Sequence, residues 1–395
     1  MPNILPIHPF PARMAPEIAL DEINNLPIDA TILDPMMGSG TVLRVAIESN
    51  HRAIGRDLDP LAILMSSVWT TPIDREKLRK AASIVVVEAQ AMRDEEVNIP
   101  SIDADPETRK FIEYWFAKQQ ANDLRRLVKA IDLSAESQAI TQALKLAISK
   151  IIITKDRGAS LARDTSHSRP HRVALANDYD VMQGFLQSVN RLAQRLSFSH
   201  TSTNCDVALG DARNLLFIPD TSIDAVITSP PYLNAIDYMR GHRLALVWLG
   251  YRLTDLRQIR STAIGVERAI AQDADHELAK RMLEQLDTNH QLPQREASMV
   301  KRYIVDLYAM LSEIQRVLKP DGRAVLVVGN SNIRGVFVSN ANAVMKIAEH
   351  IGMECRSNRE RELPSNKRYL PPPTEDGKSN LTKRMRTESV LTFIR

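Results

Sequence analysis

The segment 30–47 is the feature that most limits the folds open to this chain. Residues 30–33 form a short apolar run typical of a buried strand, and a turn containing Gly38 and Gly40 follows directly. Apolar residues at 42, 43, 45, 46 and 47 then begin a helix, for which Ser39 or Thr41 is the expected N-cap. A strand, a tight turn and a helix in this order predict one unit of an α/β fold.

This glycine turn has the chemistry of a ligand loop. Without side chains, Gly38 and Gly40 let the backbone approach a ligand closely, and the free N–H groups of the helix start favour an anionic group such as a carboxylate. The loop lacks the Lys-Ser/Thr of a P-loop and is not Gly-x-Gly-x-x-Gly. About 20 residues later, a second strand ends at Asp57 and Asp59, placed to accept hydrogen bonds from ribose hydroxyls.

A second strand end carries a different set of groups. The apolar run 223–227 leads straight into Thr228-Ser229-Pro230-Pro231-Tyr232, where two prolines must end the strand ladder because they donate no N–H. Ligands of open α/β sheets bind outside the carboxyl ends of the strands. The Ser229 hydroxyl and the Pro230 carbonyl suit the hydrogens of an exocyclic amine, while Tyr232 can stack on the ring that bears it.

The two motifs together resemble the amino-methyltransferases that modify exocyclic nitrogens of DNA bases. Their signature is Asp/Asn/Ser-Pro-Pro-Tyr/Phe, and the serine form is commonest among enzymes that make N4-methylcytosine. The segment 34–41 closely resembles their S-adenosylmethionine loop, with Met36 where many relatives carry Phe. The resemblance covers roughly residues 8–70 and 205–395. It implies a class I methyltransferase Rossmann-like sheet, mostly parallel with an antiparallel edge strand, and a helical insertion.

The family's cofactor site transfers onto three segments of this chain. The Pro-rich stretch 8–16 resembles the arm that lies against the cofactor, and Gly210-Asp211-Ala212 resembles the segment that meets the adenine edge. The resemblance therefore implies S-adenosylmethionine as the cofactor and assigns to its site Pro11, Ala12, Arg13, Asp34, Pro35, Gly38, Ser39, Gly40, Thr41, Asp57, Asp59, Asp211 and Ala212. Asp59 is also a candidate cap for the helix that starts at Pro60. The implied catalytic residues are Ser229, Pro230, Pro231 and Tyr232.

Helical periodicity dominates the region between the two halves. Apolar stripes at helical spacing run over 78–92, 106–131 and 135–153, so residues 71–204 are predicted to form a mainly helical insertion and a candidate target-recognition region. Residues 240–300 form a smaller insertion after the catalytic motif. The methyltransferase core is then 1–70 with 205–395. Within it a helix at 303–318, a turn at 319–322, a strand at 323–328, a helix at 341–351 and an edge strand at 388–394 are expected.

Basic segments supply candidate contacts to double-stranded DNA. Residues 155–172 hold five Lys/Arg and two His against two Asp, and the long Pro-rich loop 363–388 is also basic. A solvated surface explains both segments equally well. The candidates are Arg157, Arg163, His167, Arg169, His171, Arg172, Tyr238, Arg240, Arg243, Lys367, Arg368, Lys383, Arg384 and Arg386.

Composition limits the classes of protein to which the chain can belong. Net charge is +3 with pI near 8.8, which permits a nucleic-acid partner without requiring one. Cys205 and Cys355 have no metal-ligand spacing and neither follows a proline, which argues against a metal site and against C5-cytosine chemistry. No apolar run reaches about 18 residues, so a cytoplasmic protein without a membrane span is expected.

The expected reaction is direct in-line methyl transfer to a flipped base. Four alternatives stay open at this point: N4-cytosine methylation, N6-adenine methylation, guanine-N2 methylation of transfer RNA, and a non-catalytic DNA-binding protein on the same scaffold. The target sequence, the oligomeric state, and the presence of a companion restriction nuclease or other defence protein are not readable from these residues.

Overall fold

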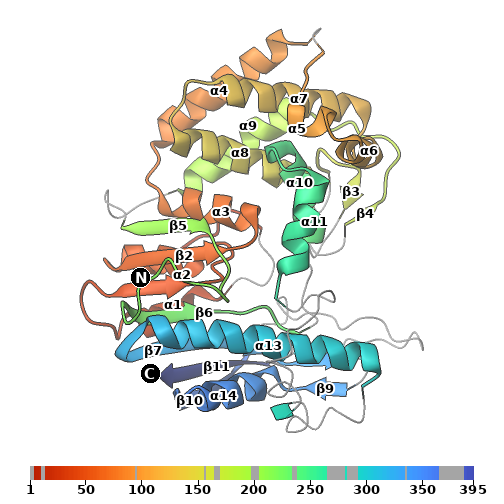
Figure 1. The fold of residues 1–395 in the computed structure, drawn as a ribbon. Helices are drawn as coiled ribbons and strands as arrows, with labels where there is room; N and C mark the ends of the chain where they lie inside the picture. The colour runs from red at the N-terminus through yellow and green to blue at the C-terminus, as the bar shows by residue number, and fades with distance from the viewer. Residues whose placement is uncertain are drawn as a thin grey trace.

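A seven-stranded sheet forms the lower half of the molecule (Figure 1). The computed structural model describes residues 4–9, 14–93, 96–154, 157–163, 170–196, 204–233, 238–264, 281–282, 292–333, 336–363 and 387–395. The strand order is β10-β11-β7-β6-β1-β2-β5. The strands are β1 Thr31–Asp34, β2 Arg52–Asp57, β5 Cys205–Leu209, β6 Ile223–Thr228, β7 Leu318–Gly329, β10 Glu354–Glu362 and β11 Thr387–Ile394.

The strand directions confirm the expected class I methyltransferase-like sheet. The pairs β5–β2, β2–β1, β1–β6 and β6–β7 are parallel, whereas β11 is antiparallel to both β7 and β10. The hairpin partner of the predicted 388–394 strand is β10, so the antiparallel edge lies where it was expected. The chain runs from β1 at the centre outward to β5 and from β6 outward to β7, so the strand order reverses between β1 and β6, and the crevice in which open α/β sheets bind ligands is expected at the carboxyl ends of these two strands.

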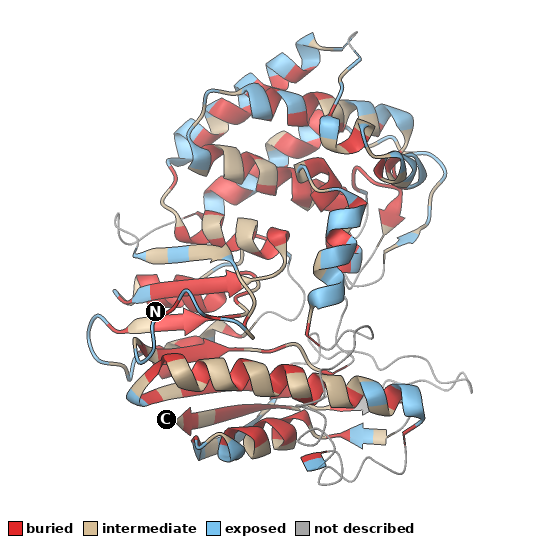
Figure 2. Cartoon of the chain, viewed as in Figure 1, coloured by how far each residue is buried: buried red, intermediate tan, exposed pale blue. Residues whose placement is uncertain are grey.

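Successive residues of the strands bury opposite faces of this sheet. Ile32 packs with α1 (Pro16–Ile23) and α2 (Thr41–Glu48), whereas Leu33 packs with α13 (Gln294–Val317) and α14 (Asn340–His350). The same alternation separates Val325 from Leu326 in β7. Because side chains of a strand alternate between faces, apolar residues at both positions require helices on both sides. Figure 2 shows the resulting buried layer through the sheet.

A helical unit sits above the sheet and shares one core with α3 (Pro60–Thr70). Its described helices and short strands are α4 Arg75–Ala91, α5 Pro100–Asp103, α6 Pro106–Trp115, α7 Lys118–Leu133, α8 Gln138–Ile152, β3 Ala162–Arg163, β4 His171–Arg172, α9 Val181–Arg195, α10 Tyr238–Leu246, η1 Val247–Leu249 and α11 Leu253–Thr262. The core contains Leu244 and Trp248 as well as residues of α4, α7, α8 and α9. We therefore propose that segment 71–204 and residues 238–262 act as one unit, whereas Val300, at the end of the predicted insertion 240–300, lies on α13 and packs in the core of the sheet.

Three local predictions were wrong in detail. The stretch 106–131 is two helices, because Phe116 adopts an extended conformation and packs edge-on against Trp248 at 5.1 Å between ring centroids. The N-cap of α2 is Gly40, and neither Ser39 nor Thr41 caps it. The predicted turn at 319–322 lies within β7, where Leu318 pairs with Ile223 and Arg323 with Ala225, so the four residues between them bulge.

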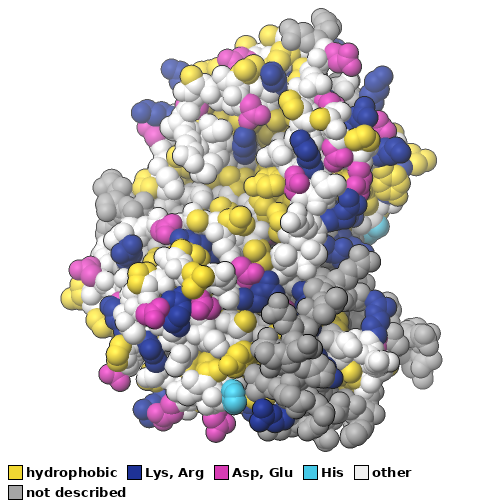
Figure 3. Space-filling model, viewed as in Figure 1, with side chains coloured by type: hydrophobic (Ala, Val, Ile, Leu, Met, Phe, Trp, Pro, Cys, Tyr) yellow, Lys and Arg dark blue, Asp and Glu magenta, His cyan; other side chains and the backbone are white. Residues whose placement is uncertain are grey.

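The surface drawn in Figure 3 mixes charges of both signs. Lys and Arg side chains alternate with Asp and Glu over the helical unit and over the visible side of the sheet, with no single-sign patch in this view. None of the described helices has the length and apolar character needed to cross a membrane. The strands β8 Ser331–Ile333 and β9 Val336–Val338 form a small separate hairpin after β7.

Candidate cofactor and catalytic site

The two motifs meet at the crevice through a hydrogen bond between buried side chains. β1 and β6 are parallel neighbours, so their carboxyl ends lie side by side. The Thr228 hydroxyl donates to Asp34 Oδ1 at 2.7 Å, and the Met36 N–H donates to the same oxygen at 3.2 Å. The glycine loop that begins at Asp34 is therefore held against the strand end that precedes Ser229. Residues 194 positions apart in sequence are brought into one site.

The glycine loop leaves the start of α2 open to a ligand. Gly40 has φ of 83°, a left-handed conformation that side-chain-bearing residues rarely adopt. A Cβ at this position would also lie 2.7 Å from Ser66 Oγ. No side chain caps α2. Because the N–H groups of the first turn point out of an uncapped helix, they can bind an anionic group such as a carboxylate.

Asp57 and Asp59 have different structural roles at the end of β2. Asp57 accepts from the Gly38 N–H and from the Asp59 N–H, both at 2.9 Å, and so braces the glycine loop. Asp59 caps α3 by accepting from the Leu61 N–H at 2.9 Å, and its other carboxylate oxygen contacts His242 Nδ1. The expectation that Asp59 caps this helix is confirmed. Asp57, in the position expected for a ribose contact, remains our candidate for that role.

Two carboxylates, the buried Asp34 and the half-buried Asp57, border the loop without an ion pair in the described ranges. Asp34 and Asp57 form no ion pair with any cationic side chain of the described ranges. Burial raises the pKa of Asp34 to about 7, against the hydrogen bonds from Thr228 and the Met36 N–H. Burial also raises the pKa of Asp57 to about 6, with a further rise from the charge of Asp59. A positively charged ligand would favour the ionised form of both groups.

The Ser229–Tyr232 segment follows directly after β6 and carries hydrogen-bond acceptors. Ser229 Oγ donates to the Val327 carbonyl of β7 at 3.0 Å, which fixes the hydroxyl and leaves its lone pairs as acceptors. Pro230 is buried and Pro231 half-buried. Tyr232 is also half-buried and packs against the core that includes α13. On that helix, burial raises the pKa of the Tyr303 hydroxyl, and the charges of Tyr232 and Asp306 raise it further. The arrangement can accept the hydrogens of an amine.

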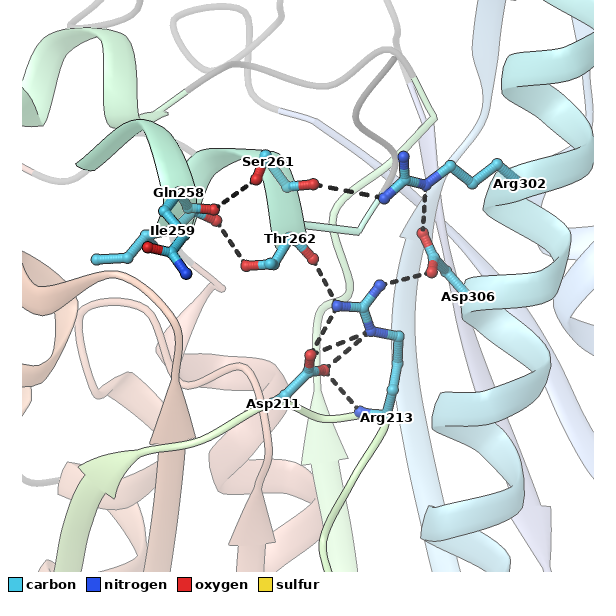
Figure 4. Close-up of polar contacts among 8 residues, drawn as sticks. All are labelled: Asp211, Arg213, Gln258, Ile259, Ser261, Thr262, Arg302 and Asp306. Atoms are coloured by element: carbon cyan, nitrogen blue, oxygen red, sulfur yellow. Dashed lines mark hydrogen bonds and ion pairs between the residues drawn. The ribbon is translucent and has the colours of Figure 1, made fainter. Parts of the chain in front are cut away.

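Asp211 is engaged by Arg213 rather than left open (Figure 4). Arg213 Nη2 donates to Asp211 Oδ2 at 2.6 Å, and Arg213 Nε donates to both carboxylate oxygens at 3.0 and 3.2 Å. The Arg213 N–H adds a bond of 2.9 Å to Oδ1. The carboxylate therefore shapes the turn after β5. A contact between Asp211 and an adenine edge stays a prediction, as does one from the buried Ala212.

Arg213 also joins three separate elements, a role that sequence reasoning missed. Its Nη1 lies 2.6 Å from Asp306 Oδ1 on α13, and its Nη2 donates to the Thr262 carbonyl at the end of α11. Arg302 donates to the neighbouring Ser261 carbonyl at 3.5 Å and lies 3.8 Å from Asp306. Cations at a helix C-terminus interact favourably with its carbonyls. No local pattern in the sequence predicted these partners, because they lie 49 and 93 residues from Arg213.

The described DNA-contact candidates lie on β3, on β4, on α10 and on the segment before β3. Figure 1 places β3, β4 and α10 on the side toward which the parallel strands point. The Arg172 guanidinium lies 4.9 Å from the Tyr114 ring centroid, and that of Arg243 lies 5.2 Å from Phe111, so both stack on α6. Tyr238 stacks on the His242 ring, with centroids 6.3 Å apart. Other candidates have these positions: Arg163 bonds backbone carbonyls of its own turn, Arg157 pairs with Asp178, and His171 and Arg240 are exposed.

Several predicted site residues lie outside the described residues. They are Pro11, Ala12 and Arg13 of the cofactor arm, His167 and Arg169 of the first basic segment, and Lys367, Arg368, Lys383, Arg384 and Arg386 of the second. Their roles stay predictions. Within the described ranges, no group of three or more His, Cys, Asp or Glu side chains has an arrangement that would hold a metal ion.

Comparison with known proteins gives sequence relatives of one kind. No family model matches the chain. The chain is 24% identical over 370 residues to the Type II methyltransferase M.MvaI of Kocuria varians, covering 84% of this chain and 78% of that protein. It is 24% identical over 366 residues to the Type II methyltransferase M.AvaI of Nostoc sp. strain PCC 7120, covering 81% and 72%. The chain is therefore similar in sequence to Type II methyltransferases over most of its length.

Two solved structures show a weak likeness to this chain. A SAM-dependent methyltransferase from Methanosarcina mazei is 10% identical, with 97% of this chain and 98% of that chain covered and a TM-score of 0.34. A TehB-like SAM-dependent methyltransferase from Corynebacterium glutamicum is 12% identical, with 96% and 87% covered and a TM-score of 0.30.

Proposed function

We propose that this chain, a relative of Type II methyltransferases, is an S-adenosylmethionine-dependent DNA methyltransferase that modifies the exocyclic N4 of cytosine. The observation that carries the proposal is the 2.7 Å hydrogen bond between Thr228 and Asp34. It joins the loop that resembles an S-adenosylmethionine loop to the Ser-Pro-Pro-Tyr segment, so that a methyl donor and a flat amine-bearing ring would share one crevice.

The residues around the glycine loop fit this cofactor. S-adenosylmethionine supplies a methyl group on a positively charged sulfur, which an amine nitrogen can attack directly. Asp34 is a buried carboxylate and Asp57 a half-buried one, neither has an ion pair in the described ranges, and they would hold the positive charges. The uncapped start of α2 would bind the carboxylate end. Asp57 would accept hydrogen bonds from the ribose, as acids at this strand end do.

The catalytic segment would position the base rather than react with it. A target base must leave the duplex to enter such a crevice, at a cost of a few kcal/mol. Tyr232 would stack on the flipped ring, while Ser229 Oγ and the Pro230 carbonyl would accept hydrogen bonds from its amine. These bonds hold the nitrogen lone pair out of conjugation with the ring and toward the methyl group. The contribution of the protein is then mainly orientation.

Cytosine N4 is proposed as the target because residue 229 is a serine, the form commonest among N4-cytosine enzymes. The DNA duplex would be contacted by the candidates on β3, β4 and α10, with the basic segments around them. Stacking of Arg172 and Arg243 on aromatic rings of α6 supports this role, because it fixes the positions of two guanidinium groups that can contact phosphates.

The test is transfer of labelled methyl from S-adenosylmethionine to mixed-sequence duplex DNA and to total RNA, with nucleoside analysis of the products. N4-methylcytosine in DNA is the expected result. N6-methyladenine would keep the reaction and correct the base, and label in RNA alone would move the function to RNA modification. Cofactor binding with no transfer to any nucleic acid would overturn the enzymatic proposal and favour a DNA-binding protein.

A further inference from the structure

The link between Thr228 and Asp34 is made by two side chains that are shut off from water. Thr228 is 0% exposed and Asp34 is 3% exposed. Asp34 Oδ1 accepts both from the Thr228 hydroxyl and from the Met36 N–H. One carboxylate oxygen is therefore shared between the end of β6 and the first turn of the glycine loop, and movement of either loop must alter a buried polar contact.

The second oxygen of Asp34 is left for a ligand. Oδ2 makes no hydrogen bond to the part of the chain that the structure describes. The charged group that acts on Asp34 is Asp57 of β2, whose carboxylate is itself held by backbone N–H groups. With an acid as its charged neighbour, Asp34 gains most from a cation at Oδ2. The ammonium group of an amino-acid-like cofactor is a cation of this kind.

The opposite end of the link controls the catalytic segment. Thr228 pairs in register with Leu326 of β7, and the next residue, Ser229, donates to the Val327 carbonyl at 3.0 Å. The Thr228 side chain is thus one peptide away from the hydroxyl proposed to accept the amine. A hydroxyl that follows the Asp34 carboxylate can tilt this peptide, whereas an apolar side chain of the same shape cannot follow it.

We infer that Thr228 is a positioning residue whose hydroxyl couples the Asp34 carboxylate, where the cationic cofactor binds, to the orientation of Ser229. The inference rests on the proposed function, because it takes the cofactor of that proposal. Thr228 then has two roles. In the cofactor-free protein its hydroxyl holds the glycine loop in place, and with cofactor bound it orients the Ser229 hydroxyl for methyl transfer. Ionised Asp34 is the stronger acceptor for this hydroxyl, so the coupling depends on its charge.

The test compares Thr228→Val, which keeps the shape and removes the hydroxyl, with Thr228→Ser, which keeps the hydroxyl. Affinity for S-adenosylmethionine is measured on the full chain by calorimetry from pH 5.5 to 8.5, and kcat at saturating cofactor is measured on duplex DNA. For Thr228→Val we expect kcat to fall about tenfold or more, as loss of a hydrogen bond to a charged group implies. We also expect the pH at which affinity falls to half its plateau to rise. Thr228→Ser should restore both quantities.

Two results would overturn the inference. One is a Thr228→Val variant that loses kcat while its pH profile of cofactor affinity matches that of the wild type, which would make the residue merely structural. The other is no change in either quantity. If Thr228→Val does not fold, Asp34→Asn provides the same test. It should move the acid limb of cofactor affinity down to the pH range of Asp57 and lower kcat, and an acid limb at the wild-type pH would contradict the coupling. Absence of methyl transfer by the wild type would instead overturn the proposed function, with the affinity profiles still readable.

Discussion

His242 Nδ1 is in hydrogen-bonding contact with the carboxylate of Asp59, although 183 residues separate them. The other oxygen of Asp59 caps α3 at the Leu61 N–H. One carboxylate therefore fastens α10, the helix that follows the catalytic segment, to the helix that follows the predicted ribose acid. Both partners are nearly buried, with side-chain exposures of 7% for His242 and 13% for Asp59.

Loss of this contact should destabilise the folded protein. His242→Ala leaves a largely buried carboxylate oxygen without its partner, at a cost of about 1–3 kcal/mol in the free energy of unfolding. His242→Asn places an amide N–H near the position of Nδ1 and should recover most of this loss. Urea unfolding of both variants measures the difference. Equal destabilisation by alanine and asparagine would show that ring packing, and not the Asp59 contact, matters at this position.

Removal of the Arg213 side chain should strongly destabilise the folded protein. Its side chain is 19% exposed, and its removal takes an ion pair at 2.6 Å from Asp306, which is 9% exposed, whereas Arg302 lies 3.8 Å from the same carboxylate. Breaking such a pair leaves a buried charge, so we expect Arg213→Ala to lower the free energy of unfolding by about 3 kcal/mol. Arg213→Lys should give a smaller loss, because an ammonium group holds Asp306 without the forked contacts to Asp211 and Thr262. If Arg213→Ala lowers the free energy of unfolding by less than about 1 kcal/mol, the contacts of Arg213 drawn in Figure 4 do not stabilise the protein as proposed.

Stability without cofactor should depend on the charge of Asp34. Its pKa of about 7 in the folded protein is above its ordinary value of 3.8, so the folded state holds the proton more tightly. The stability contributed by the protonated group is present below about pH 4 and is lost as pH rises to about 7. Asp34→Asn, which cannot ionise, should therefore raise the free energy of unfolding at pH 8 by a few kcal/mol, and by much less at pH 5. An equal effect at both pH values, in urea titrations, would rule out ionisation as the cause.

Tyr232 should matter for turnover and little for the cofactor. Stacking of a base on an aromatic ring is worth about 1–3 kcal/mol, so Tyr232→Ala should lower kcat/KM for DNA by about 5-fold to 150-fold. Tyr232→Phe keeps the ring and should stay near the wild type. Dissociation constants for S-adenosylmethionine, measured in parallel, should change less than about twofold in either variant. Equal loss of cofactor binding and turnover in Tyr232→Ala would contradict the proposed role of Tyr232 in stacking on the target base.

Arg240 should contribute to DNA affinity through its charge. It is exposed on α10, next to the proposed catalytic segment. Arg240→Ala should weaken binding to duplexes of every sequence to a similar degree, and it should reduce the slope of log affinity against log salt by about one. The matched control is Arg79→Ala on α4, where the arginine pairs with Glu76 away from the crevice. An unchanged salt slope for Arg240→Ala would remove this residue from the DNA surface.

Short-range patterns were sufficient for most elements of the sheet. The run before Asp34, the glycine turn and the helix after it lie within 18 residues, and their pattern of apolar and special residues predicted β1, the loop and α2. The same holds for β6 before Ser229 and for the Asp59 cap of α3. In each case the physical cause is local: a glycine tolerates a left-handed conformation, a proline ends a ladder, and an aspartate caps the helix next to it.

Local sequence pattern did not predict the structure where an aromatic residue or a helix end contacts a residue that is distant in sequence. The break at Phe116 follows from its packing against Trp248, so the apolar stripe over 106–131 was misread as one helix. The uncapped start of α2 likewise follows from Gly40 and its close approach to Ser66. An apolar periodicity reports that a residue prefers burial, but it carries no information on which residue will cover it.

By itself the sequence determined most strands of the parallel sheet, the glycine loop and the place of Ser-Pro-Pro-Tyr at a strand end, because each depends on neighbours a few residues away. Only the tertiary structure decided that Asp34 meets Thr228, that Asp59 meets His242, and that Arg213 holds Asp306 and the end of α11. These partners are between 49 and 194 residues apart. Pairing over such distances follows from the order of strands in the sheet and from the helices packed on it, since buried polar groups take the partners that the packed core brings within reach.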